Sequence, residues 1–341
     1  GDGIGDFYAQ LTPVLEEDRI YAAARDGDVT AFERDSGKEL WSVDLADLPI
    51  NADKRSARLS GGLVSRYGKL FLGSENGVVY ALNAENGEVL WQTTVPGEVV
   101  ASPAVEDGRV VVLTTSGRLV ALDTDEGKLQ WTLSEEQPPL TLRSAGAPVI
   151  TNGAVLYGRA DGKVGIALLS NGQPVRQSKV ADPRGATELD RMVDVDAAPL
   201  IAGDELYAIA YNGQLMARKL MSGDEVWKRK YSGYRDMAVT GNAIVLTDSR
   251  SHLFAVDRRN GLELWSNTQL ENRTVTAPVI LGDYVVVGDV EGYLYWLDRT
   301  DGTIKAMQQL DSSGLYAAPL VDGDTLYVQS RGGKLYAIKR P

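Results

Sequence analysis

The chain of 341 residues contains no cysteine and a single histidine, His252. Without cysteine it has no disulfide, no thiolate nucleophile and no cysteine-ligated metal. One histidine cannot build a histidine-based catalytic triad or a multi-histidine metal site. His252 follows Arg250 and Ser251 in an expected turn, where we predict that its side chain is exposed to solvent.

The sequence also lacks long apolar runs and stripes of basic residues. No stretch approaches the ~18 consecutive apolar residues of a membrane-spanning helix. The 35 basic and 47 acidic residues give a net charge of −12, and nucleic acid is therefore not expected as a partner. No low-complexity linker interrupts the chain, which predicts a single domain over residues 1–341, with any targeting or anchoring segment upstream of Gly1.

A ten-residue spacing between two small residues recurs seven times, and successive units begin 38 to 51 residues apart. The spaced pairs are Gly27/Gly37, Gly77/Gly87, Gly117/Gly127, Gly162/Gly172, Gly213/Gly223, Ser251/Gly261 and Gly292/Gly302, and Gly333 begins an eighth unit. Such a period indicates stacked supersecondary units that cannot bury their apolar faces alone.

Each unit reads as four short antiparallel strands separated by Gly and Asp turns, without the 3.6-residue apolar period of helices. Eight such units predict an all-β fold, an eight-bladed β-propeller with four antiparallel strands per blade. Most units carry a tryptophan four residues after the second glycine, and we expect it to pack between neighbouring blades. The C-terminus precedes the last such strand, which predicts a short eighth sheet whose closing outer strand lies upstream of Gly1.

The segment from Ala121 to Trp131 resembles the tryptophan-docking repeat of the pyrroloquinoline quinone propeller superfamily, and Ala255 to Trp265 matches it too. Within that superfamily, stretches outside the repeat resemble the BamB family of the bacterial outer-membrane β-barrel assembly machinery. These stretches are Pro139 to Arg143, Glu188 to Asp196, Ala210 to Gly213, Gly288 to Trp296 and Asp311 to Gly314. The resemblance implies a lipid-anchored scaffold at the outer membrane, facing the periplasm, that binds the POTRA domains of BamA.

Long connections between expected blades concentrate on one part of the chain. They follow the first, third and fourth blades, and extra loop length is where function concentrates. The last two contain residues 138–143, the first segment, and residues 188–196, the second segment. The first segment places Leu140 and Leu142 on one side of an extended backbone with Arg143 at the edge, typical of an apolar anchor rimmed by charge.

The second segment is acidic, and the resemblance singles out Asp194 and Asp196 as an acidic contact for a basic partner surface. Plain alternatives remain open: the two leucines close the base of a blade, and the acidic residues cap turns. Asp-x-Asp supplies too few of the 6–8 oxygen ligands of calcium. We therefore predict partner binding by Leu140, Leu142, Arg143, Asp194 and Asp196.

We expect no catalytic, cofactor-binding or metal-ligating residue. The runner-up is a quinoprotein dehydrogenase, which would need a cofactor platform and several converging carboxylates. A further alternative is a scaffold that accepts unfolded outer-membrane proteins by β-strand addition to a sheet edge.

Overall fold

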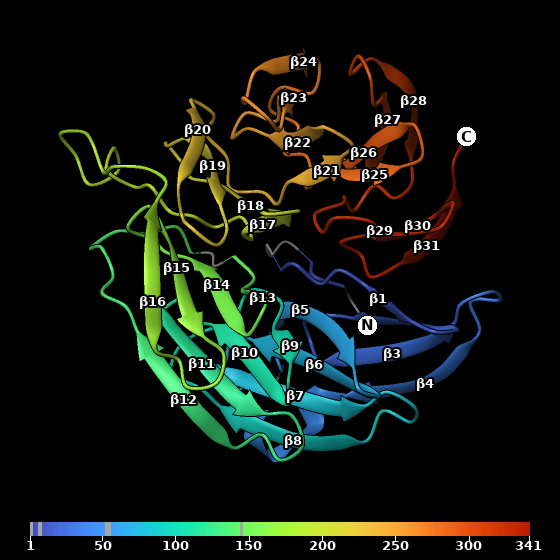
Figure 1. Ribbon diagram of the computed structural model, residues 1–341. Helices are drawn as coiled ribbons and strands as arrows, with labels where there is room; N and C mark the ends of the chain where they lie inside the picture. The colour runs from blue at the N-terminus through green and yellow to red at the C-terminus, as the bar shows by residue number, and fades with distance from the viewer. Residues whose placement is uncertain (1–2, 6–8, 52–55, 144–145) are drawn as a thin grey trace. The chain divides into compact units, whose positions relative to one another are not determined.

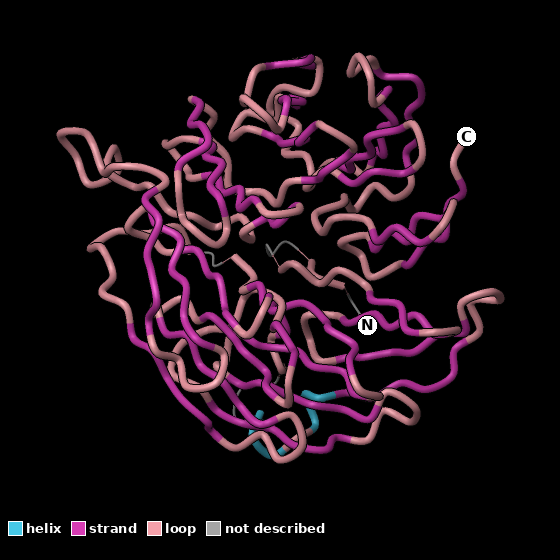
Figure 2. Tube along the Cα trace, viewed as in Figure 1, coloured by secondary structure: helices cyan, strands magenta, loops and turns pink. Residues whose placement is uncertain are grey.

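The computed structural model describes residues 3–5, 9–51, 56–143 and 146–341, and these form β-strands with two short 3-10 helices (Figures 1 and 2). Seven sheets have four strands and one has three, each in sequential antiparallel order. The prediction of an all-β, eight-bladed β-propeller is confirmed. By its contacts the chain divides into two compact units, Gly1–Ser134 with Asp311–Arg340, and Glu135–Leu310 with Pro341. One domain over 1–341 stays a prediction.

The first unit contains the first three sheets and the last one. Its elements are β1 (Val14–Glu16), β2 (Arg19–Ala23), β3 (Asp28–Glu33), β4 (Glu39–Asp44), η1 (Leu45–Asp47), η2 (Pro49–Asn51), β5 (Leu59–Arg66), β6 (Lys69–Ser74), β7 (Val78–Asn83), β8 (Val89–Thr94), β9 (Ala104–Glu106), β10 (Arg109–Leu113), β11 (Arg118–Asp123), β12 (Leu129–Ser134), β29 (Leu320–Asp322), β30 (Thr325–Gln329) and β31 (Leu335–Lys339).

The second unit contains the four sheets between them. Its elements are β13 (Val149–Thr151), β14 (Ala154–Gly158), β15 (Lys163–Leu168), β16 (Pro174–Lys179), β17 (Leu200–Ala202), β18 (Glu205–Ile209), β19 (Leu215–Lys219), β20 (Glu225–Arg229), β21 (Ala238–Thr240), β22 (Ala243–Thr247), β23 (Leu253–Asp257), β24 (Glu263–Asn267), β25 (Val279–Leu281), β26 (Tyr284–Gly288), β27 (Tyr293–Asp298) and β28 (Ile304–Gln309).

The third sheet shows how local sequence makes these hairpins. Asp107 and Gly108 both have positive φ, at 48° and 70°, and they form the two-residue loop between paired Glu106 and Arg109. A two-residue loop with two positive φ angles matches the right-handed twist of its strands. Val110 and Val112 of β10 are fully buried, so the hairpin places its apolar residues in the core.

The repeat has a physical basis in the pairing of the third and outer strands. A register shift between these strands recurs in seven sheets, and in five of them alanine stands opposite tryptophan just before it, as at Ala121 and Trp131. In the seventh sheet the two types are exchanged, because Trp296 of β27 pairs with Ala306 of β28 and is buried. Ala306 stands where most units carry the outer-strand tryptophan, and the neighbouring strand supplies the aromatic ring instead.

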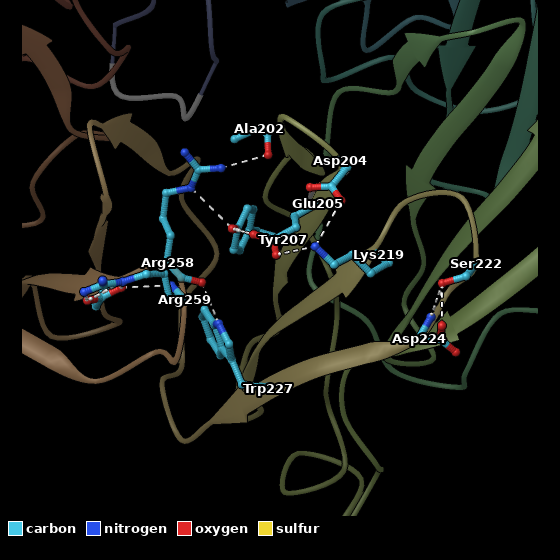
Figure 3. Close-up of polar contacts among 11 residues, drawn as sticks. Ala202, Asp204, Glu205, Tyr207, Lys219, Ser222, Asp224, Trp227, Arg258 and Arg259 are labelled. Atoms are coloured by element: carbon cyan, nitrogen blue, oxygen red, sulfur yellow. Dashed lines mark hydrogen bonds and ion pairs between the residues drawn. The ribbon is translucent and has the colours of Figure 1, made fainter.

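Tryptophans dock on the next sheet of the same unit, as predicted. The indole N–H of Trp227 donates to the carbonyl oxygen of Arg258 at 2.7 Å (Figure 3). A Cβ atom on Gly261 would lie 2.5 Å from the Trp227 ring, so only glycine leaves room for it there. The other docking pairs of tryptophan ring and glycine are Trp41 with Gly87, Trp91 with Gly127, and Trp265 with Gly302.

Arg176 takes the place of tryptophan in the fourth sheet and makes an equivalent contact. Its guanidinium donates to the carbonyl oxygen of Met221 at 2.8 Å, and a Cβ atom on Gly223 would overlap it. An arginine with an apolar stem and a planar head fills the same site as an indole.

The eighth sheet has three strands among the residues that the structure describes, which agrees with the expected short sheet. That the completing strand comes from upstream of Gly1 stays a prediction.

The prediction that His252 is exposed to solvent is wrong. Only 14% of its side chain is accessible, and Nδ1 lies 3.0 Å from an Asp248 carboxylate oxygen. Asp248 opens the turn and accepts the backbone N–H groups of Arg250 and His252. The ring is thereby turned inward, edge-on to Phe254 at 6.4 Å.

Candidate partner-binding site

The two predicted binding segments meet in the second unit. The first segment lies between β12 and β13, and the second lies in the loop that projects beyond β16 (yellow-green in Figure 1). The backbone N–H of Leu142 donates to Asp194 Oδ1 at 2.9 Å. One hydrogen bond therefore joins residues that are 52 positions apart in sequence.

The five predicted site residues differ in accessibility. Leu140 is 42% exposed, Arg143 is exposed and Leu142 is half-buried, so these three can offer an apolar and basic surface. Asp194 and Asp196 are 1% and 9% exposed. Both carboxylates are buried, and that of Asp194 holds the backbone of the first segment.

Burial determines the electrostatics of Asp194. Desolvation raises the pKa of its carboxyl group from 3.8 to about 6, while the Leu142 N–H acts in the opposite direction by stabilising the charged form. Its second oxygen, Oδ2, is buried without a hydrogen-bond partner among the described residues. The carboxylate is therefore costly to keep charged where it stands.

Close backbone approach fixes the end of the second segment. A Cβ atom on Gly158 would overlap the carbonyl oxygen of Val195, and one on Gly146 would lie 2.7 Å from that of Asp196. The N–H of Val195 donates to the Arg159 carbonyl oxygen at 3.1 Å. Glycine at 146 and 158 is what allows this backbone to settle against β14.

The outer part of the second segment is a self-contained turn. Thr187 and Asp190 hydrogen-bond reciprocally, since each backbone N–H donates to the side-chain oxygen of the other residue. The Thr187 hydroxyl, which donates to the Asp190 carboxylate at 2.8 Å, and the Thr187 N–H lower the pKa of that carboxyl group. Leu189 is 64% exposed at this turn and adds an apolar side chain that the sequence argument did not single out.

A buried charged cluster next to the first segment was not predicted from the sequence. Arg159 forms ion pairs with Glu135 at 2.8 Å and with Asp161 at 2.9 Å, and its side chain is 8% exposed. The hydroxyl of Tyr157 donates to the other Glu135 oxygen at 2.5 Å. The available signal was a glutamate at a repeat position that is aliphatic in four other units.

The described ranges contain neither a metal-binding cluster nor a membrane-spanning helix. There, no three His, Asp or Glu side chains converge in a group that could hold a metal ion. Within the same ranges, no helix has the length and apolar character needed to cross a bilayer.

The sheets define the class as an eight-bladed β-propeller. A family model described as outer membrane protein assembly factor BamB matches residues 25–267 and 268–340. The chain belongs to the BamB family.

Individual relatives agree with that assignment. The BamB of Shewanella oneidensis is 44% identical over 286 residues, which cover 83% of this chain and 72% of that relative. The crystal structure of BamB from Moraxella catarrhalis superposes with a TM-score of 0.89 at 25% identity, covering 98% of this chain and 97% of that one. The curated relatives are named as assembly factors, which agrees with the expectation of a non-enzymatic scaffold.

Likeness to enzymes is limited to the fold. The quinohemoprotein alcohol dehydrogenase of Comamonas testosteroni superposes with a TM-score of 0.76 at 12% identity, covering 96% of this chain and 71% of that one. The same propeller carries different functions, so the quinoprotein alternative gains nothing from this match.

Proposed function

We propose that the chain is a scaffold subunit of the outer-membrane β-barrel assembly machinery, on the periplasmic side, that binds the POTRA domains of BamA. The first and second segments form the contact surface. The observation that carries the proposal is the Leu142–Asp194 hydrogen bond, which unites the two segments in one site. Membership of the BamB family supports a role for such a site in the assembly of outer-membrane proteins.

The chemistry of this surface suits a protein partner. Leu140 and Leu142 provide an apolar centre, and Arg143 provides a planar cation that can pair with a carboxylate through two hydrogen bonds. Asp194 contributes by fixing the backbone of the segment that presents them, and Asp196 lies buried two residues further on. The partner surface that fits is an apolar patch next to an acidic side chain.

Alanine substitutions at Leu142 and Arg143 are expected to weaken binding to purified POTRA domains by about tenfold each, and at Leu140 by a smaller factor. Truncating a central anchor typically costs about 1–2 kcal/mol of binding free energy. Leu142→Ala keeps the backbone N–H that Asp194 accepts, so the segment stays in place while the side chain is lost. The measurement is the Kd by calorimetry or interferometry.

The control is Leu264→Ala, which removes an exposed leucine from outer strand β24; Leu264 is 54% accessible and Leu140 is 42% accessible. It should bind POTRA domains as the unmodified chain does. Wild-type affinity in all three segment variants, with unchanged unfolding curves, would contradict the proposal.

A further inference from the structure

Glu135 departs from the repeat at the position that directly follows an outer strand. In four other sheets the residue at this position is aliphatic and donates its N–H to the glycine carbonyl of its own sheet's second turn, at 2.8 to 3.0 Å. These residues are Leu45, Val95, Val180 and Leu310. Leu45, Val95 and Val180 are fully or almost fully buried. The repeat therefore shows that an aliphatic side chain fits this environment, yet a glutamate with 13% exposure occupies it after β12.

Arg159 departs from the repeat as well. It opens the turn between β14 and β15, where the N–H of the first turn residue donates to the carbonyl oxygen four residues on. Residues with the same bond are Ala24, Thr114, Ala210, Asp248, Asp289 and Ser330. Those with polar side chains accept N–H groups of their own turn. The Arg159 guanidinium donates to Asp161 of its own turn at 2.9 Å and also reaches out of the turn to pair with Glu135 at 2.8 Å.

The two exceptional residues connect the binding segments. Glu135 stands three residues before the first segment, and its carboxylate is held by the Arg159 guanidinium and the Tyr157 hydroxyl. The Arg159 carbonyl oxygen accepts the N–H of Val195, between the two aspartates of the second segment. Arg159 thus holds one segment through its side chain and the other through its backbone.

Stability alone does not account for this pair. A buried ion pair is commonly no more stable than apolar residues of similar volume, because desolvation offsets the attraction. In four other sheets the first position is aliphatic, and at the second position Ala24 and Ala210 are small while Thr114 and Ser330 bond within their own turns. What an ion pair adds is a fixed geometry between the two elements it joins.

We propose that Glu135 and Arg159 are positioning residues that set the arrangement of the two segments for partner binding. The inference rests on the proposed function and deepens it. Neither residue touches the partner; both act through Leu142 and Val195, whose backbone N–H groups lie at the junction of the segments.

The test replaces both residues by those found at the same positions of other blades, in the double variant Glu135→Val/Arg159→Thr. We expect it to fold and to unfold at a denaturant midpoint close to that of the unmodified chain. Its Kd for purified POTRA domains should rise about tenfold, and amide hydrogen exchange at Leu142 and Val195 should accelerate at least tenfold. Glu135→Gln keeps an oxygen that can accept the Tyr157 hydroxyl. Its Kd and its exchange rates should therefore lie between those of the unmodified chain and those of the double variant.

The control is another buried ion pair, Arg25 and Glu75, whose side chains are 13% and 8% exposed. Arg25→Met/Glu75→Gln removes the same chemistry from the first unit and should leave POTRA affinity unchanged. Wild-type affinity and exchange rates in both Glu135 variants would overturn the inference. Full affinity in the Leu142 and Arg143 variants would instead overturn the proposed function, while the exchange rates would still decide whether the pair fixes the segments.

Discussion

Truncating Trp265 to alanine is expected to lower the free energy of unfolding by about 3–5 kcal/mol, the usual cost of removing a large buried aromatic side chain. Trp265 is 7% exposed and packs in the core between the sixth and seventh sheets. Its indole N–H donates to the Arg299 carbonyl oxygen at 2.9 Å, and its ring covers Gly302. Alanine would leave a cavity between two sheets and an unpaired carbonyl group.

Two companion variants separate packing from hydrogen bonding in a urea titration. Leu264→Ala, at the exposed neighbouring position of the same strand, should change the free energy of unfolding by less than about 0.5 kcal/mol. Trp265→Phe keeps most of the ring and loses the N–H donor, for an expected cost of about 1 kcal/mol beyond the packing change. A loss below 1 kcal/mol in Trp265→Ala would show that docking does not hold the sheets together.

The fold was predictable because each repeat carries its own instructions. Turn glycines, β-branched strands and a docking tryptophan recur with fixed spacing, so every unit supports the same interpretation. Exceptions to the consensus were harder: Arg176 and Trp296 fill the tryptophan site by other means. A chemically different side chain at the tryptophan site cannot be recognised from the sequence, because only the packing of the neighbouring sheet shows which space must be filled.

The site was predictable only in outline. Loop length and resemblance indicated which segments matter, and the hydrogen bond from Leu142 to Asp194 shows that they meet. The burial of Asp194 was not predictable, because it depends on the close approach of the next residue, Val195, to Gly158, and two strands separate these residues in sequence. The inward turn of His252 likewise depends on Asp248 and Phe254 acting together.

Asp194→Asn is expected to stabilise the chain by up to about 3 kcal/mol at pH 7.5, relative to its effect at pH 4. Burial raises the pKa of Asp194 to about 6 in the folded chain, against about 3.9 in an unfolded one. Each pKa unit corresponds to about 1.4 kcal/mol. The wild-type carboxyl is neutral in both states below pH 4, so it is penalised increasingly as pH rises from 4 to 6 and constantly above that.

The measurement is the unfolding free energy of both proteins at pH 4 and pH 7.5, because taking the difference between the two pH values cancels any constant cost of the amide. All other ionisable groups are shared, so the pH-dependent part belongs to Asp194. A difference that does not change with pH would mean that the carboxyl group is not desolvated in the folded chain.

Affinity for POTRA domains then shows why a costly carboxylate is kept. Asparagine retains an oxygen that can accept the Leu142 N–H, whereas Asp194→Ala leaves that N–H without its acceptor. If Asp194 acts by holding the first segment, Asn should bind nearly as the unmodified chain does and Ala should bind about tenfold more weakly. If Asn is more stable but binds as weakly as Ala, the charge itself is needed by the partner, because the segment would still be held in place.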